Sequence, residues 1–479
     1  MILAIPLLAV LAALWCAIPR TGRAAPAVTF LAAVAVLSIS IRLLWTLSGG
    51  GTLTVIRGWV ELNSLAALLL TLIALVYATA ALFSWGYLAS DATSESRIRL
   101  YHANFNLFAF SMLSIPMLNE IGLVWIFVEL TSLLSILLVS FAISADALEA
   151  AWKYMVLTLL GATIAVLGVL VLYWALHATG STEFTWDGLH AAAARMPHAL
   201  LGFAFVLLLV GYGAKIGLVP LHTWLPDAHS QAPSPVCAML SGIETSVILY
   251  VVLRLRNVFA GDPSLHVGAW FVVLGLISVG AAALLLTQTQ DYKRLFAFST
   301  VEHMGIILTA AGLLTPAGDV AAVWQLLAHS ATKSLCFYAA GVTLIATGTR
   351  DIAAIRGLLG TSRFAAAALL FGALAIGGAP PFAVFLSELA ILRAGLLAHA
   401  YVLVALLAFF IVVAFFGLLW HVTNMVAGPP ESEPRRRRIP LTCAWALLLA
   451  ALPVVILGVW LPQGLAQALE SAARVLGAA

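Results

Sequence analysis

The stretch ALLGFAFVLLLVGYGAKIGLVPL, residues 199–221, decides the fold class of this chain. It is an apolar run with one charge, Lys215, and it reaches the roughly 20 residues that a helix needs to cross a bilayer. Similar runs recur along the whole chain of 479 residues, of which 63% are hydrophobic and only 9% are charged. Soluble globular proteins carry roughly 25% charged residues. The sequence therefore predicts an all-α polytopic membrane protein.

The apolar runs predict fourteen transmembrane helices. Their expected cores are residues 2–18, 28–47, 62–88, 103–119, 121–141, 152–174, 199–221, 233–253, 265–287, 296–315, 320–347, 364–392, 401–426 and 441–462. Gly and Pro interrupt the runs at 199–221 and 364–392, which predicts a broken seventh and a broken twelfth helix. Paired breaks of this kind indicate two inverted five-helix repeats, helices four to eight and nine to thirteen.

The connections between the predicted helices differ in positive charge. After odd-numbered helices we count fourteen Lys and Arg: Arg20, Arg23, Arg97, Arg99, Lys153, Lys293, Arg294, Arg350, Arg356, Arg363 and Arg435 to Arg438. After even-numbered helices we count six: Arg42, Arg57, Arg195, Arg254, Arg256 and Arg393. Because cytoplasmic loops carry the excess of positive charge, we expect both termini on the outer face of a bacterial or archaeal cytoplasmic membrane. The run Arg435–Arg438 is expected to anchor this topology, with a lipid-headgroup or partner site as the alternative.

Other features exclude several functions. The net charge is only +3, which argues against nucleic-acid binding, and no phosphate-binding glycine motif is present. Four dispersed cysteines predict small buried side chains rather than metal ligands. His222, Asp227 and His229 lie in a proline-rich stretch that predicts a bent connection and not a metal site. We therefore expect no cofactor and no metal, while Gly49, Gly50 and Gly51 before residues 52–56 predict a small hairpin.

Charged and ionisable residues lie deep inside the apolar runs, where each charge costs at least about 2.5–3.5 kcal/mol. They are Glu129, Lys215, Glu244, Glu302, His303, His329, Lys333 and Glu388. A closed set of ion pairs clamping the helices together is one interpretation. Buried pairs are poor stabilisers, so an array spread over six helices favours the other interpretation, a proton or cation path. The trio Asp291, Lys293 and Arg294 is interpreted as a solvated loop.

Three motifs also carry a family resemblance. KIGLVPLHTWLPDAHSQAPSPV (215–236), DYKRLFAFSTVEHMGI (291–306) and AHSATKSLCFYAAG (328–341) resemble signatures of the antiporter-like proton-pumping subunits of respiratory complex I and their relatives. The resemblance covers about residues 100–395. It implies three N-terminal helices in 1–100, repeats in 101–257 and 258–427, and a last helix with a tail in 428–479.

The resemblance also implies roles for individual residues. Glu129 and Lys215 match the family's modulating pair, Lys333 matches a lysine of the eleventh helix beside His329, and Glu388 matches the charged residue of the broken twelfth helix. In place of the family's eighth-helix lysine the chain has Ser246, with Glu244 two residues earlier. The relay is therefore expected to run through Glu244 and water or to be impaired. The expected proton path is Glu129, Lys215, Glu244, His303, His329, Lys333 and Glu388.

The pair Glu302–His303 and the phrase GGAPPFAVFLSELAIL (377–392) look most like membrane subunits of formate hydrogenlyase and hydrogenase-4 complexes. A complex I subunit and a subunit of a multisubunit Na⁺/H⁺ antiporter are the alternatives. The expected partners are the lipid bilayer, other membrane subunits, and peripheral hydrogenase-like or dehydrogenase subunits with iron–sulfur clusters, which would hold the redox centres that this chain lacks. A stand-alone transporter and a structural subunit that has lost pumping also remain open.

Overall fold

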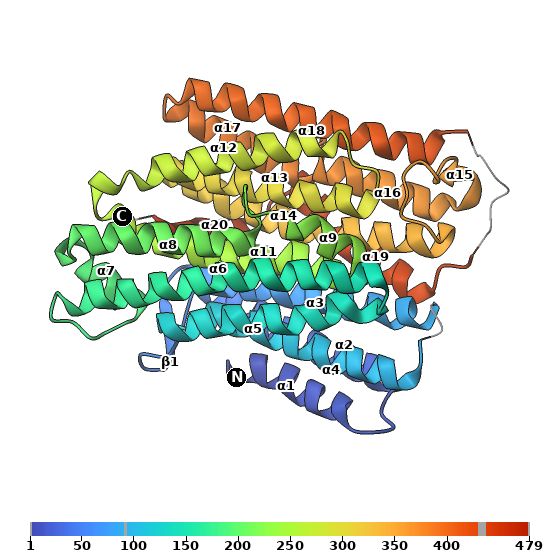
Figure 1. Cartoon of the computed structure of the whole chain (residues 1–479), viewed down its shortest axis with the longest axis horizontal. Coiled ribbons are helices and arrows are strands. Elements are labelled where there is room, and N and C mark those ends of the chain that lie inside the picture. Colours follow the sequence, from blue (N-terminus) through green and yellow to red (C-terminus); the bar gives the residue numbers. More distant parts are fainter. Residues whose placement is uncertain (1, 91–92, 430–436, 478–479) are drawn as a thin grey trace.

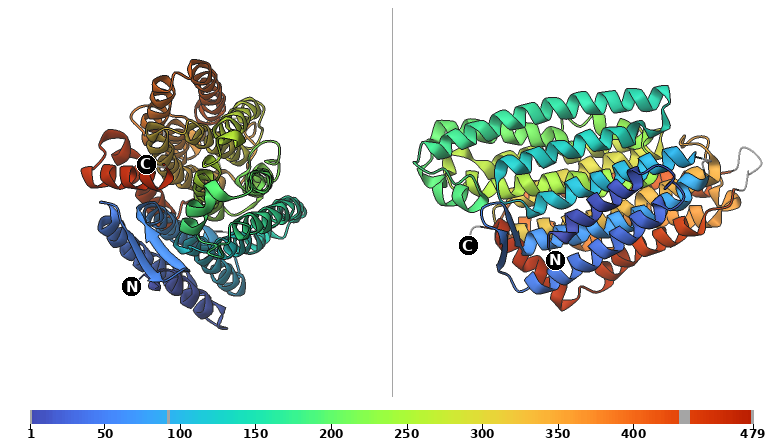
Figure 2. Two further views of the ribbon diagram at one scale, coloured as in Figure 1. Left: turned by 90° about the vertical axis from the view of Figure 1, so that its left-hand side faces the viewer. Right: turned by 90° about the horizontal axis from the view of Figure 1, so that it is seen from below.

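The computed structural model describes residues 2–90, 93–429 and 437–477, and in it the helices run side by side in one bundle (Figure 1). Seen end-on, the N-terminal helices, in blue, lie at one edge of the bundle, and the last helices, in red, lie beside them (Figure 2). The first half holds α1 (Ala4–Ala17), α2 (Ala25–Leu47), α3 (Ser64–Ser90), α4 (Glu95–Ser114), α5 (Ile121–Val139), α6 (Ala145–His177), α7 (Trp186–Ala192), α8 (His198–Ile216), α9 (Trp224–Gln231), α10 (Ser234–Met239) and α11 (Thr245–Ala260).

The second half holds α12 (Val267–Leu286), α13 (Tyr292–Gly312), α14 (Pro316–Thr347), α15 (Leu358–Thr361), α16 (Arg363–Ile376), α17 (Ala383–Leu397), α18 (Tyr401–Ala427), α19 (Leu441–Val459) and α20 (Gln463–Leu476). Each of the fourteen predicted segments coincides with one helix or with consecutive helical pieces. Ten described helices are long and apolar enough to cross a membrane, and Ala4–Ala17 and Arg363–Ile376 are shorter apolar helices. The membrane fold is therefore confirmed, while the number of fourteen crossings stays a prediction.

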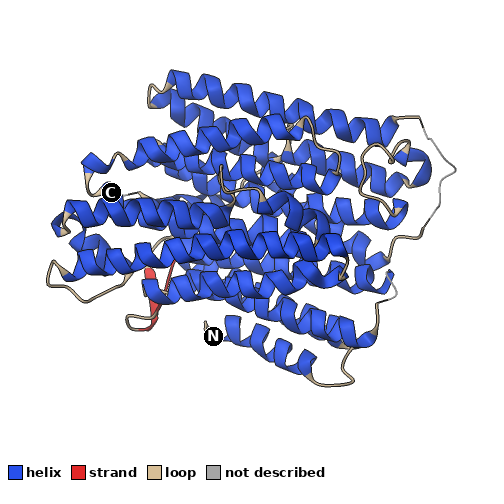
Figure 3. Cartoon of the chain, viewed as in Figure 1, coloured by secondary structure: helices blue, strands red, loops and turns tan. Residues whose placement is uncertain are grey.

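A hairpin and the chain ends lie at the same end of the bundle. Figure 3 shows the only strands among the described residues, β1 (Thr52–Ile56) and β2 (Val60–Asn63), which pair antiparallel as the Gly-rich turn predicts. The described chain begins and ends near this hairpin (Figures 1 and 2). The placement of both termini on the outer face of the membrane stays a prediction. Arg435 and Arg436 lie outside the described residues.

Two helices are broken by glycines where the sequence predicts it. α8 ends at Gly217, whose φ of 86° lies in the left-handed region. α16 ends before Gly377, and Gly378 has a φ of 77°. A side chain is strained in this conformation but glycine is not, so the chain can leave each helix within the bundle. The breaks place Lys215 in the last turn of α8 and Glu388 early in α17.

The eighth segment forms one continuous helix with a π-turn in its middle. α10 passes through η4 (Leu240–Glu244), a π-helical turn, into α11. Every residue from Ser234 to Leu253 is buried, so this helix lies inside the bundle and not at the lipid surface. A π-turn holds one residue more than an α-helical turn and is frequent at functional sites.

The C-terminal segment forms a further helix that the sequence analysis did not predict, because the tail was assigned no structure. α20 is amphipathic and buries Ala468, Leu469, Ala472 and Leu476. It packs on α3 and α14. All four cysteines are free and buried, as predicted.

Candidate functional site

The first group of ionisable side chains surrounds Lys215 at the end of α8. Lys215 is only 2% exposed, and its ammonium donates a hydrogen bond to the backbone carbonyl of Val128 on α5. It lies within electrostatic reach of Glu244 and Glu129, yet among the described residues neither carboxylate forms a direct ion pair with it. The expected Glu129–Lys215 pair is thus near in space but open.

Glu129 lies on α5 directly after the residue that binds Lys215. Its side chain is partly buried, and its Oε2 atom has no hydrogen-bond partner among the described residues. A buried carboxylate oxygen without a donor is costly. This oxygen therefore remains available to a proton, to water or to the Lys215 ammonium.

Glu244 is the last residue of the π-turn and is held by neutral donors. The Thr131 hydroxyl donates to its Oε1 at 2.7 Å, and the Tyr154 hydroxyl lies 3.2 and 3.3 Å from its two oxygens. Ser135 in turn contacts the Tyr154 hydroxyl at 2.7 Å. These donors fix the carboxylate without cancelling its charge.

The second group lies on α13, α14 and α17, around Lys333. Lys333 is fully buried, and its ammonium donates to the Phe296 carbonyl at 2.6 Å and to the Ser299 hydroxyl at 2.5 Å. No carboxylate in the described part of the chain forms a direct ion pair with it, although Glu302 lies within electrostatic reach. Both site lysines are therefore bound by neutral oxygens.

Two histidines lie beside Lys333 in a chain of hydrogen bonds. The rings of His303 and His329 have centroids 5.2 Å apart. His303 Nδ1 contacts the Gln325 amide at 2.8 Å, its Nε2 contacts the Ile376 carbonyl at 3.0 Å, and the Ser387 hydroxyl donates to Gln325. This chain links α13 and α14 to both sides of the break between α16 and α17.

Glu302 and Glu388 continue the line from Lys333 toward this break. Both are 6% exposed, and each lies within electrostatic reach of the other. A methyl group added at Gly378 would lie 2.4 Å from Glu388 Oε2. The glycine thus leaves the space that the Glu388 carboxyl occupies at the break.

The π-turn joins the two groups. On one side its Glu244 reaches Thr131 and Tyr154, and on the other its Ser241 carbonyl accepts from His329 Nε2 at 3.2 Å. Ser246 lies two residues after Glu244, and its hydroxyl contacts the Ser330 hydroxyl at 3.1 Å. The structure therefore brings all seven predicted path residues into two adjoining groups bridged by one helix.

A different buried pair shows what a structural clamp looks like in this bundle. Arg256 and Asp319 are 2% and 3% exposed and form a two-pronged ion pair, with N–O distances of 2.5 and 3.0 Å. Arg256 also donates to the Leu476 carbonyl of α20 at 2.5 Å. The site lysines lack any such closed partner, which sets them apart from a clamp.

Sequence reasoning missed the neutral partners of the charged groups, chiefly Thr131, Tyr154, Gln325 and Ser387. One signal was available. Gln325, His329 and Lys333 are spaced four residues apart, so they share one face of α14. Tyr154 and Thr131 carry no comparable signal, because hydroxyl side chains are common in membrane helices.

The interpretation of Asp291, Lys293 and Arg294 as a solvated loop is wrong. Asp291 caps α13 by accepting from the backbone N–H groups of Lys293 and Arg294, and Lys293 is 1% exposed. Asp291 is partly exposed, and Arg294 is exposed and pairs with Asp227 at 2.7 Å. The N-cap begins the helix at Tyr292, four residues before the predicted core 296–315, so that Lys293 lies in its first turn and in the protein interior.

No group of three or more His, Cys, Asp or Glu that could hold a metal ion occurs among the described residues.

What the fold and the site define is a class: polytopic helical membrane proteins in which buried, unpaired ionisable groups form a line between two broken helices. The sequence profile of the family described as "NADH:quinone oxidoreductase/Mrp antiporter, TM" matches residues 119–415, more than half of the chain. The chain belongs to this family of antiporter-like membrane subunits.

Two relatives illustrate the similarity. The hydrogenase-4 component F homolog of Methylacidiphilum infernorum (isolate V4) is 35% identical over 413 residues, which cover 84% of this chain and 85% of that protein. Hydrogenase-4 component B of Escherichia coli (strain K12) is 29% identical over 342 residues, 68% of this chain and 49% of that protein. This chain therefore spans most of the first relative but only about half of the second.

Solved structures show the same fold. A chain of the membrane-bound sulfane sulfur reductase, an archaeal respiratory membrane complex, matches with a TM-score of 0.89 and 24% identity, covering 99% of this chain and 98% of that chain. A chain of the Mrp complex from Dietzia sp. DQ12-45-1b matches with a TM-score of 0.88 and 23% identity, covering 99% and 97%. Both neighbours belong to multi-subunit membrane complexes, so other membrane subunits are partners of this class of chain.

Proposed function

We propose that this chain translocates protons across the cytoplasmic membrane, driven by redox chemistry in partner subunits of a hydrogenase-type complex. The observation that carries the proposal is the line of buried ionisable groups from Glu129 to Glu388. Its lysines are bound by neutral oxygens, in contrast to the closed Arg256–Asp319 pair of the same bundle. An unpaired charge in a membrane protein calls for a function. The hydrogenase type is supported by the 35% identical relative named as a hydrogenase-4 component.

The proposed path follows the order of contacts. Lys215 retains its proton when Glu129 and Glu244 approach it and releases the proton when they recede, because a nearby carboxylate favours the ammonium form. From Glu244 the path crosses the π-turn to His329 and His303, and then reaches Lys333 and Glu388. The hydroxyl pair Ser246–Ser330 supports a relay at the position where the family's eighth-helix lysine is missing.

The proposal extends to the organisation of the chain and its surroundings. We assign the repeats to residues 101–257 and 258–427, each with one broken helix, and both termini to the outer face. The proposed peripheral partners are redox subunits with iron–sulfur clusters, because the sequence holds no motif that binds an electron carrier. Mild-detergent purification with mass spectrometry should then recover a hydrogenase-like large subunit. Recovery of small hydrophobic partners only would favour the antiporter alternative.

The direct test replaces Lys215 with Met in the native complex. Redox-driven proton uptake into inverted membrane vesicles should be abolished, since Met fills the site but carries no proton. Lys153→Met is the matched control, because Lys153 is an exposed lysine in surface ion pairs with Glu149 and Asp227. It should pump normally. Normal pumping by an assembled Lys215→Met complex would overturn the assignment, and a strict sodium requirement would redirect it to Na⁺.

A further inference from the structure

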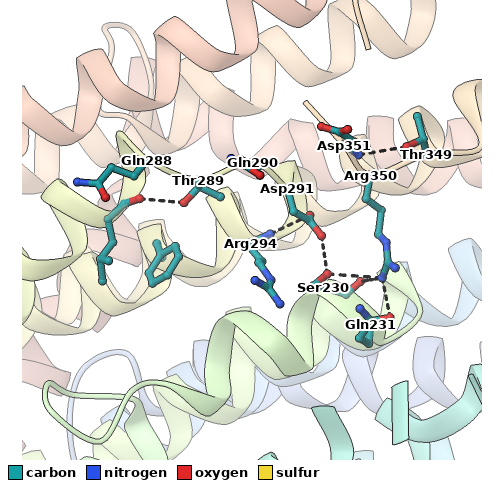
Figure 4. Close-up of a pocket in the computed structure, with 12 residues that line it drawn as sticks. Ser230, Gln231, Gln288, Thr289, Gln290, Asp291, Arg294, Thr349, Arg350 and Asp351 are labelled. Atoms are coloured by element: carbon teal, nitrogen blue, oxygen red, sulfur yellow. Dashed lines mark hydrogen bonds between the residues drawn. The ribbon is translucent and has the colours of Figure 1, made fainter. Parts of the chain in front are cut away.

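A polar cavity opens on the side of the bundle that holds the odd-numbered connections. Its volume is about 680 Å³, and it lies between the end of α9, the start of α13 and the chain after α14 (Figure 4). Ser230, Gln231, Gln288, Asp291, Arg294 and Arg350 are among the residues that line it. None of them belongs to the proposed path. The cavity is therefore a second polar feature of the molecule that the proposed function has not used.

The wall of this cavity is a hydrogen-bond network that ends on a buried ammonium group. The Ser230 hydroxyl donates to Asp291 at 2.5 Å, and the Ser230 carbonyl accepts from Arg350 at 2.6 Å (Figure 4). Behind the wall, Lys293 donates to that same Ser230 carbonyl at 3.0 Å and to the Ala232 carbonyl at 2.5 Å. No carboxylate among the described residues forms a direct ion pair with Lys293. It thus resembles the path lysines in being bound by neutral oxygens.

Behind Lys293 lies His229, a fully buried histidine with one nitrogen unused. His229 Nδ1 contacts the Leu225 carbonyl at 2.7 Å, so in the neutral ring this nitrogen carries the hydrogen. Its Nε2 is then a bare acceptor, and it has no hydrogen-bond partner among the described residues. Buried polar atoms of this kind are rare and need a reason.

His229 is a neighbour of both Lys293 and Lys333. Both lysines lie within electrostatic reach of the imidazole. The His229 ring lies 5.4 Å from that of Phe337, which also faces Phe296, whose carbonyl binds the Lys333 ammonium at 2.6 Å. The order cavity, Lys293, His229, Lys333 thus follows from neighbouring contacts.

We propose that this cavity is the mouth of a proton half-channel in which Lys293 and His229 carry protons between bulk water and Lys333. The inference rests on the proposed function and adds its access route. In one step the Lys293 ammonium gives a proton to His229 Nε2, directly or through water, and regains one from the cavity. In the next, the imidazolium gives that proton to a neutral Lys333 amine, while Nδ1 keeps its own hydrogen on Leu225. The charged groups facing this route are Asp291, Arg294, Arg350, Glu302 and the two lysines.

Lys293 could instead serve only to tie α13 to the segment after α9, and one substitution separates the two roles. Lys293→Arg keeps the positive charge and the donors, but arginine does not release its proton in proteins. A tie would survive this change, whereas a carrier would not. His229→Gln removes the titratable nitrogen while leaving a polar side chain in place. The two substitutions are tested in separate variants.

We would measure redox-driven proton translocation by the intact complex in inverted vesicles. Lys293→Arg and His229→Gln should each lower the rate at least about tenfold, the scale at which a positioned proton carrier contributes. Lys153→Arg, on the surface, should have no effect, and native gels should show equal assembly. A full rate in Lys293→Arg together with a dead Lys215→Met complex would overturn this inference alone. A full rate in Lys215→Met would overturn the proposed function.

A second measurement does not depend on pumping. The thiol of Cys237 donates to the His229 carbonyl at 3.0 Å and shares the Ala232 carbonyl with the Lys293 ammonium, so it is a native reporter at the inner end of the route. With the other cysteines replaced by Ala, a small cationic thiol reagent added on the cavity side should modify Cys237. A chain that keeps only Cys443, which lies against the Phe83 carbonyl, should not react. Equal inertness of both thiols would exclude an aqueous route at this place.

Discussion

At the scale of single residues, the recurring feature is an ammonium group bound by main-chain oxygen. Lys215, Lys293 and Lys333 each donate to a backbone carbonyl, and none forms a direct ion pair in the described part of the chain. A neutral acceptor leaves no stranded charge when the lysine loses its proton. A carboxylate in the same place would hold the proton more tightly, as in a closed ion pair. The backbone contacts thus suit groups that must change charge inside a membrane.

Glu244 offers a test at this scale. Glu244→Gln keeps the size of the side chain and can still accept from Thr131 and Tyr154, but it removes the negative charge near Lys215. We expect at least about a tenfold loss of redox-driven proton translocation with normal assembly. Glu149→Gln, an exposed glutamate on α6, is the control and should pump at the full rate. Unchanged pumping in Glu244→Gln would remove this residue from the path.

The sequence predicts the charged members of the site and misses the rest for a physical reason. A charge inside an apolar run is expensive, so its presence alone marks Glu129, Lys215 and Lys333 as functional. Hydroxyl and amide side chains cost far less, and Tyr154 and Gln325 therefore leave no mark until their contacts are known. Lys293 was misassigned because its position near a helix start looks polar in sequence although it is buried in space.

At the scale of elements, the β1–β2 hairpin makes a prediction for stability. Glu61 on β2 accepts from Asn119 at 3.4 Å. Burial raises the pKa of the Glu61 carboxyl, and Asp187 raises it further while Arg254 opposes this. Since the raised pKa means that folding disfavours the charged form, the cost appears as pH rises above the unfolded value of about 4.3.

Glu61→Gln should therefore raise the thermal stability of the purified protein at neutral pH. The difference from the unsubstituted protein should shrink as pH falls toward about 4.3 and vanish below it, where both side chains are neutral. Thermal unfolding in detergent across this pH range measures the effect. Glu183→Gln, on the exposed connection before α7, is the control for the substitution itself. A stability gain that did not depend on pH would point to a cause other than charge.

The helix breaks were predictable as elements and α20 was not. Gly and Pro inside an apolar run mark a break because they remove helical hydrogen bonds or demand a special backbone conformation. α20 is too polar overall to be seen as a membrane helix, and its apolar face is defined only by what it packs against. Its docking on α3 and α14 is a tertiary property.

At the scale of the whole molecule, the Arg256–Asp319 pair ties α11, α14 and α20 together. Arg256→Met leaves the buried Asp319 without its partner and should destabilise the fold by about 3–5 kcal/mol. Arg256→Met with Asp319→Leu should recover most of this loss, because no buried charge then remains. Thermal unfolding in detergent compares the stability of the single and the double variant with that of the unsubstituted protein. An equal loss in the single and the double variant would show that the pair itself is not the source.

The fold class follows from composition alone, since so little charge cannot coat a soluble protein of this length. The placement of both chain ends on one face was also predicted, because an even number of crossings requires it. The register between packed helices could not be predicted from the sequence, because it depends on which small residues let two helices approach closely. Gly211 is an example, since a methyl group there would lie 2.5 Å from the Ala165 backbone nitrogen.

The π-turn in the eighth helix limits how the gene for this chain can change length. Each helical residue turns the chain by about 100°, and deleting one residue shortens a helix by about 1.5 Å. Because a π-turn holds one residue more than an α-helical turn, loss of Gly242 or Ile243 would relax the turn to an ordinary helix and leave the residues after it in their present orientation. A one-codon deletion here would thus be absorbed. The same deletion at the start of α11 would rotate every later residue of that helix by about 100° and carry Arg256 away from Asp319.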